Sequence, residues 1–351
     1  MTKIYQFSLP ITPSSLRGLQ EILRSAQILT LFDESIDPYD AGLYRYQAAE
    51  YGSECKAVVD LNVFKDVLSI ARPGDARAIS DRQIGAAFIA FCQCADIMIE
   101  PAMAIHESPN QLKEELTWFR RIDNADTNAL ISIAFGGGHQ IAIDQLPEIG
   151  PLDLPGTIPE KLVGHMALQT AVLKIVSLVR AGGRPVDNFE RFLRWSYDEY
   201  LFSREAIHLA LLQFSRGQAK PILRNINSHN PTKRLSGVEN AVWDLIHARD
   251  WSKRIGDQGK NNDIWLFCSR DRALQRLARN MVMATDNDSK SMEHMEKIFS
   301  RSFDESAGKR LLRLYLDLYA NADADIRPAN RPDFDEHCLS VHEALMRSFL
   351  K

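Results

Sequence analysis

Apolar residues recur at helical spacing along most of the chain, whereas three short runs are apolar at nearly every position. These runs are AVVD at 57–60, DIMIE at 96–100 and DIWLFCS at 263–269. Each run is followed by a segment in which apolar residues return to helical spacing. Strands that alternate with helices are typical of a parallel sheet covered by helices. The pattern therefore predicts an α/β core.

The long segment between the second and third runs has only helical spacing, and its helices end at glycines such as Gly182 and Gly217. We interpret it as an all-helical insertion in the core. The predicted division is an N-terminal extension (1–56), a core (57–108 and 236–285), the insertion (109–235) and a C-terminal helical extension (286–351).

Acidic residues occupy comparable places at the edges of these elements. Asp60 and Asp271 follow the first and third runs, and functional groups collect beyond the carboxyl ends of parallel strands. Glu107 lies on the helix predicted after the second run, and Asp244 lies on a later helix, outside its apolar stripe. A single Asp after a strand is more often a helix cap, and Asp244 alone is typical of a solvated face. The prediction of a site depends on the four acids together.

Clustered carboxylates predict a bound cation, because they repel one another unless protons or a cation are present. Mg²⁺ and Mn²⁺ take carboxylate oxygens and keep several waters, which suits phosphodiester chemistry. Such an ion makes a bound water a better nucleophile and stabilises charge on phosphate oxygens. If the four acids converge, they form an Mg²⁺ or Mn²⁺ site.

Four segments resemble the PIN-like nuclease family, and they occur in the family's order: VVDLNVFKDVL, IMIEPAMAIHE, VWDLIHA and WLFCSRDRALQRLA. The first is similar to the family's apolar strand followed by Asp, any residue, Asn and Val. The last is similar to its strand followed by Ser or Thr, any residue, Asp and a helix. The resemblance implies a PIN-like parallel sheet flanked by helices, an Mg²⁺ or Mn²⁺ site, and cleavage of RNA, less often DNA, by a metal-activated water.

The resemblance also implies roles for individual residues. Its metal-binding acids are Asp60, Glu107, Asp244 and Asp271, and Ser269 is a neighbour that hydrogen-bonds the site. Glu100, at the end of the second run, is the alternative to Glu107. The insertion is far longer than the family's usual connection between the second and third acids, which leaves three roles open for it: a substrate platform, a lid or an oligomerisation surface.

A basic stripe follows Asp271 and favours nucleic acid independently of the resemblance. Arg272, Arg276 and Arg279 are spaced i, i+4 and i+7, which places them on one side of the predicted helix. Such a stripe can hold phosphates. The alternative is an ordinary solvated face.

Composition narrows the class of protein. The 351 residues are 45% hydrophobic with a formal net charge of −4, so a large core is expected and nucleic acid must bind a local basic surface. The five cysteines form no C-x-x-C pair, which favours reduced thiols. No apolar run approaches membrane-spanning length, and we expect a cytoplasmic protein with no membrane partner.

These patterns together favour a metal-dependent endonuclease that prefers RNA, and by analogy a toxin or an anti-phage effector. The competing hypothesis is a non-catalytic PIN-like module in which the acids are caps and the helical insertion binds a protein partner. A metal-dependent phosphatase is less favoured, because no D-x-D follows a predicted strand.

Overall fold

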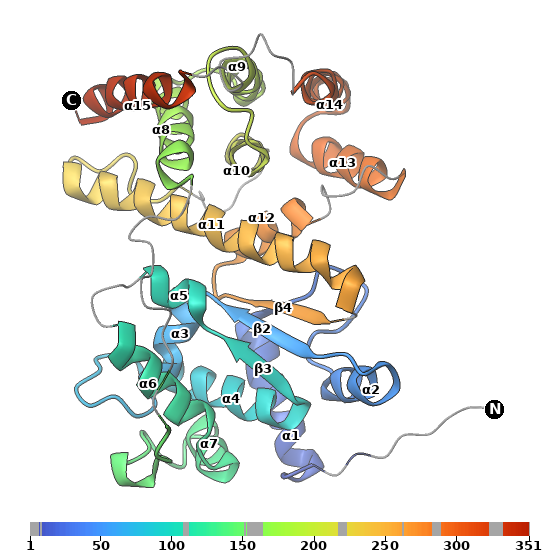
Figure 1. Cartoon of the computed structure of the whole chain (residues 1–351), viewed down its shortest axis with the longest axis vertical. Coiled ribbons are helices and arrows are strands. Elements are labelled where there is room, and N and C mark those ends of the chain that lie inside the picture. The colour runs from blue at the N-terminus through green and yellow to red at the C-terminus, as the bar shows by residue number, and fades with distance from the viewer. Residues whose placement is uncertain are drawn as a thin grey trace. The chain divides into compact units, whose positions relative to one another are not determined.

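The computed structural model describes residues 7, 9–107, 112–150, 152, 164–216, 223–261, 263–282, 289–322 and 333–350. They form two compact units, Met1–Glu160 with Lys253–Gln275 and Lys161–Ser252 with Arg276–Lys351. The first unit holds a small mixed sheet with helices, and the second is helical in its described residues (Figure 1). The chain is therefore an α/β protein with helical additions.

A four-stranded sheet in the order β1-β4-β2-β3 is the frame of the first unit. Its strands are β1 (Leu29–Thr30), β2 (Cys55–Val59), β3 (Ile97–Glu100) and β4 (Ile264–Cys268). β2 is parallel to both β3 and β4, and Ala57 pairs with Ile99 on one side and Leu266 on the other. The three predicted strands and their parallel pairing are confirmed.

Residues of the predicted N-terminal extension (1–56), from Leu19 to Cys55, belong to the core of this unit. β1 pairs antiparallel with β4, and the helices α1 (Pro13–Ala26) and α2 (Ala41–Tyr51) flank it in sequence. Leu19, Leu23 and Tyr44 from these helices are fully buried in the cluster that also contains Ala57 of β2. These residues therefore complete the sheet and its hydrophobic core.

Further helices of the first unit pack around α4 (Ile79–Ala95), which is buried along most of its length. α4 packs against α1, α3 (Leu61–Leu68) and α7 (Thr127–Ala134). α5 (Ala102–Glu107) and α6 (Leu112–Asp123) pack against α3, and a short 3-10 helix covers Ile143–Gln145. The insertion was predicted to begin at residue 109. Residues of α6 and α7, however, are part of the hydrophobic core of the first unit, which continues to Glu160. The boundary between the two units therefore lies later in the chain than the predicted start of the insertion.

The second unit consists of helices that come before and after β4 in sequence. They are α8 (His165–Ala181), α9 (Pro185–Asp198), α10 (Arg204–Gln213), α13 (Ser289–Ser302), α14 (Glu305–Ala320) and α15 (Phe334–Leu350). α8 packs against α9, α10 and α15, and α13 packs against α14. The boundary between the units falls within α11 (Pro231–Asn261) and α12 (Arg272–Val282). None of the helices in the described part of the chain is long and apolar enough to cross a membrane.

Candidate functional site

Asp60 lies at the carboxyl end of β2, where it is the N-cap of α3. Its Oδ1 accepts a hydrogen bond of 2.9 Å from the backbone N–H of Val63, and its own N–H donates to the carbonyl of Cys268 on β4. A helix leaves its first N–H groups without intrahelical partners, which explains why Asp is favoured here. The side chain is nevertheless almost completely buried, with 2% of the residue exposed.

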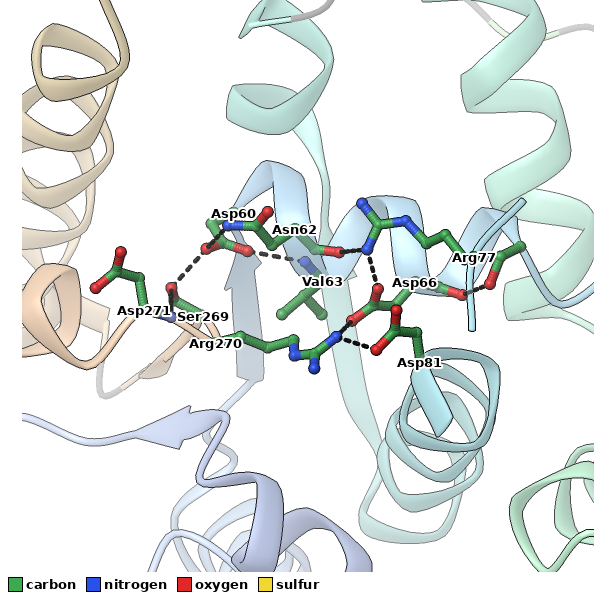
Figure 2. Close-up of polar contacts among 10 residues, drawn as sticks. Asp60, Asn62, Val63, Asp66, Arg77, Asp81, Ser269, Arg270 and Asp271 are labelled. Carbon is green, nitrogen blue, oxygen red and sulfur yellow. Dashed lines mark hydrogen bonds and ion pairs between the residues drawn. The ribbon is translucent and has the colours of Figure 1, made fainter. Parts of the chain in front are cut away.

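Ser269 joins this carboxylate to the end of the neighbouring strand β4 (Figure 2). Its buried hydroxyl donates to Asp60 Oδ2 over 2.5 Å and accepts from the backbone N–H of Asp271 over 2.9 Å. The side-chain amide of Gln275 donates to the carbonyls of Ser269 and Gln27, each at 2.6 Å. The turn between β4 and α12 is therefore fixed from both sides, and the predicted contact of Ser269 with the first acid is present.

Asp271 is the acid nearest to this bridge in sequence, and it precedes α12. Its Oδ1 accepts from the N–H groups of Ala273 at 2.8 Å and Leu274 at 3.3 Å. Asp60 and Asp271 are thus both helix caps, as the simpler interpretation of a single Asp after a strand expected. They are also held at the same edge of the sheet, because β2 and β4 are parallel neighbours that end at paired residues Val59 and Cys268.

The second acid predicted from the sequence lies along β3 or the helix after it. Glu100 ends β3 opposite Val58 of β2, and its Oε1 accepts from the N–H of Ala102 at 3.2 Å. Glu107 is the last residue of α5 and is half-buried. Glu100 therefore lies on the strand next to Asp60, near the same sheet edge, and Glu107 lies two turns of helix further along the chain.

Asp244 is on α11 in the part of that helix that belongs to the second unit. The apolar stripe predicted for this helix is confirmed, because its five residues are buried: Val238, Ala241, Val242, Leu245 and Ile246. Asp244 is outside the stripe and half-buried. His247, one turn further along the helix, is buried, with 1% exposed.

The predicted pocket of four acids is not found in the described ranges. No three His, Cys, Asp or Glu side chains in those ranges are grouped so that they could hold a metal ion. The structure places Asp60 and Asp271 at one sheet edge, where Ser269 links the carboxylate of Asp60 to the backbone N–H of Asp271. Mg²⁺ is often held by one or two carboxylates together with waters and substrate phosphates, so the chemistry of this pair fits that ion.

A second polar network, which the sequence analysis missed, lies beside the bridge (Figure 2). Asp66 of α3 is fully buried and forms ion pairs with Arg77 and, over 3.1 Å, with Arg270, the residue between Ser269 and Asp271. Arg270 also pairs with Asp81 of α4 over 2.6 Å. Burial raises the pKa of Asp66 to about 6, although both guanidiniums act to lower it. The sequence feature that could have indicated this network is Asp66, an acid among the apolar positions of VFKDVL.

The predicted basic stripe is present on α12. Arg272 and Arg276 are exposed and Arg279 is half-buried, while Leu274, Leu277 and other apolar residues of the helix are buried. The exposed basic side therefore starts in the first turn of the helix that Asp271 caps.

Comparisons of the chain with protein-family models, with curated proteins and with solved structures find no match.

Proposed function

We propose that the protein is a metal-dependent nuclease with a PIN-like core, which hydrolyses phosphodiester bonds in RNA in preference to DNA. The observation that carries the proposal is the Ser269 bridge between Asp60 and the segment of Asp271, at the carboxyl ends of two parallel strands. Ligands of open parallel sheets bind beyond this edge. A role as a toxin or anti-phage effector is proposed by analogy only.

Asp60 and Asp271 would hold an Mg²⁺ or Mn²⁺ ion at this edge, with Glu107 or Glu100 of the same unit as the further acid that the resemblance implies. When bound, the ion supplies a more acidic water and stabilises charge on the phosphate. Residues of the protein would orient the metal-binding carboxylates and contact the phosphates.

The residues around Asp60 orient its carboxylate. The N–H of Val63 holds Oδ1 and the hydroxyl of Ser269 holds Oδ2, so that rotation of the side chain would break one of the two bonds. Both partners are donors, which matches an ionised carboxylate that only accepts. Ser269 also accepts from the N–H of Asp271, and it therefore fixes the carboxylate of Asp60 relative to the backbone of Asp271. Such fixed geometry is what a site needs to position a reacting group.

The basic side of α12 supports nucleic acid as the substrate. Arg272 and Arg276 are exposed on a helix that begins at Asp271, and arginines in this arrangement can contact successive phosphates. The proposed phosphate contacts would follow Asp271 closely in sequence, on the helix whose first N–H groups Asp271 accepts.

Two observations favour a second candidate, a non-catalytic PIN-like module whose helical residues bind a protein partner. Both Asp60 and Asp271 accept backbone N–H groups as helix caps, and no group of three metal-binding side chains is present in the described part of the chain. In this candidate the two acids act only on stability.

The two candidates differ in the effect of Asp→Asn substitutions, because Asn caps a helix about as well as Asp but lacks the charge. Cleavage of labelled RNA and single-stranded DNA is measured with Mg²⁺, Mn²⁺ or a chelator. Asp60→Asn and Asp271→Asn should lower the metal-dependent rate by about 100-fold or more, since a metal ion contributes several kcal/mol. Asp126→Asn is the matched control, because Asp126 caps α7 through the N–H of Ala129.

The nuclease proposal requires that Asp126→Asn cut like wild type while the other two variants do not. If wild type does not cleave, or if all three variants cleave at the wild-type rate, the proposal is wrong. The same assay applied to Glu107→Gln, Glu100→Gln and Asp244→Asn identifies the further acids.

A further inference from the structure

The network around Asp66 joins four segments of the first unit beside the Ser269 bridge. Asp66 is on α3, one and a half turns after the Asp60 cap, and Arg77 lies in the segment between α3 and α4. Arg270 lies in the turn after β4, and Asp81 is in the first turn of α4. The four charges therefore connect the helix that Asp60 begins with the turn that carries Ser269 and Asp271.

The two arginines leave most of their donors uncommitted within the described residues. Arg77 uses Nη1 for both Asp66 and the carbonyl of Asn62, and Arg270 uses Nη1 for both Asp66 and Asp81. A guanidinium carries five N–H donors in a planar fork, so Nε and Nη2 of each can still bind a ligand. The same fork matches the oxygens of a phosphate.

The two arginines are more exposed than the two acids with which they pair. A third carboxylate, that of half-buried Asp75, accepts from the backbone N–H of Arg77 over 2.9 Å. Asp66 has no exposed side-chain surface and Asp81 has 21%, whereas Arg77 and Arg270 have 28% and 36%. An anion that approaches from solvent therefore meets the guanidiniums, with the carboxylate of Asp66 beneath them. Figure 2 shows the side chain of Arg270 leading from the Ser269 turn to Asp66, while that of Arg77 reaches the same carboxylate from another direction.

Stability alone gives a weak reason for this arrangement. Burial of a carboxylate costs several kcal/mol, and replacing a buried ion pair by apolar residues is often neutral or stabilising. Desolvation is the largest influence on Asp66 even beside two arginines. Perturbed groups of this kind concentrate at functional sites.

We propose that Arg77 and Arg270 form a phosphate-binding pair for the nucleic acid backbone, and that buried Asp66 is the positioning residue that orients both guanidiniums. The assignment rests on the proposed function for its ligand. It adds to the stripe on α12 one contact at Arg270, directly before Asp271, and one at Arg77, between α3 and α4. Asp66 itself touches no substrate.

The test is binding of a short fluorescein-labelled oligouridine, measured by fluorescence anisotropy in a chelator so that binding is separated from cleavage. Arg77→Gln and Arg270→Gln should each weaken binding about tenfold or more, since a hydrogen bond to a charged group is worth about 1.5–3 kcal/mol. Each should also reduce the slope of log K against log salt by about 0.7, as expected for one lost phosphate contact on a single strand. Arg24→Gln is the matched control, because Arg24 is a half-exposed arginine of the same unit that pairs with Asp37.

Asp66→Asn shows whether Asp66 acts by orienting the two guanidiniums or only by its negative charge. Removal of a negative charge near a phosphate should strengthen binding if Asp66 has no positioning role, whereas loss of orientation should weaken it. We expect weaker binding. Arg77→Lys and Arg270→Lys keep the charge but lose the fork, and they should bind between wild type and the Gln variants. Because these two residues are partly exposed, the Lys variants test the pair even if Asp66→Asn does not fold.

Binding by the Arg77 and Arg270 variants at wild-type strength, or no binding of oligouridine by wild type, would overturn the pair. Tighter binding by Asp66→Asn would overturn the positioning role. If the binding pattern is as expected but wild type cleaves nothing with Mg²⁺ or Mn²⁺, the nuclease proposal fails and the pair stands. If wild type cleaves but the arginine variants bind normally, the pair fails and the nuclease proposal stands.

Discussion

Close packing of α3 and α4 holds the Asp66 network in place, and Gly85 is the residue that permits it. Gly85 is buried in α4. A Cβ atom at this position would lie 2.6 Å from the carbonyl oxygen of Asp66 and 2.7 Å from its carbonyl carbon. Both are backbone atoms, which cannot rotate away as the end of a flexible side chain does. Gly85→Ala must therefore push the two helices apart.

Two opposing effects set the size of the change in stability. Ala is favoured over Gly by about 1 kcal/mol in a helix interior. Overpacking of a close-packed core costs about 1–3 kcal/mol, and a contact of 2.6 Å against backbone belongs at the upper end of that range. We therefore expect Gly85→Ala to lower the free energy of unfolding by about 1–2 kcal/mol.

Urea denaturation followed by far-UV circular dichroism measures this change, and Gly256→Ala is its control. Gly256 is also in a helix of the first unit, α11, but a Cβ there would meet nothing within 4 Å. This variant should gain stability from helix propensity alone, by about 0.5–1 kcal/mol. If Gly85→Ala is as stable as Gly256→Ala, the inferred close contact between α3 and α4 is wrong.

Three further predictions concern other parts of the molecule. Burial lowers the pKa of His208 to about 3 in the folded state. The free energy of unfolding should therefore be highest above pH 6.5, the usual pKa of histidine, and lower by about 2 kcal/mol at pH 5. Urea denaturation above pH 6.5 and at pH 5 should show this loss in wild type and not in His208→Leu. Phe64→Ala removes a ring stacked 5.1 Å from Phe119 and should cost about 3–5 kcal/mol in the same assay, and a cost below about 1 kcal/mol would contradict the packing. Ser269→Ala removes the donor to Asp60 and should destabilise the fold by about 1.5–3 kcal/mol while it weakens Mn²⁺ binding; unchanged Mn²⁺ affinity would contradict the bridge.

The strands that position the site could be predicted from sequence because each is short, continuously apolar and followed by a helix. β2, β3 and β4 were identified in this way, within two residues at either end. β1 was missed because it has two residues, Leu29 and Thr30, which are too few to show a pattern. The place of α1 and α2 in the core was missed with it, since it depends on contacts between distant parts of the chain.

The candidate site was predictable in part for the same reason. The places of Asp60, Ser269 and Asp271 follow from strand ends, which are local features. Asp66 and Arg270 are 204 residues apart in sequence, and no local pattern indicates that they pair. A cap and a metal ligand also need the same residue type at the same place, so sequence could not decide between these roles for Asp60 and Asp271.

Binding of Mn²⁺ to the folded protein tests the central claim most directly, because it asks whether the carboxylates of Asp60 and Asp271, beyond the ends of two parallel strands, hold an ion at all. Isothermal titration of wild type, Asp60→Asn, Asp271→Asn and Asp126→Asn with Mn²⁺ provides the comparison. We predict that wild type and Asp126→Asn bind with equal affinity and that the other two variants bind at least about tenfold more weakly, since each loses one charged ligand. No binding by wild type, or equal binding by all four proteins, would contradict a metal site at the ends of β2 and β4.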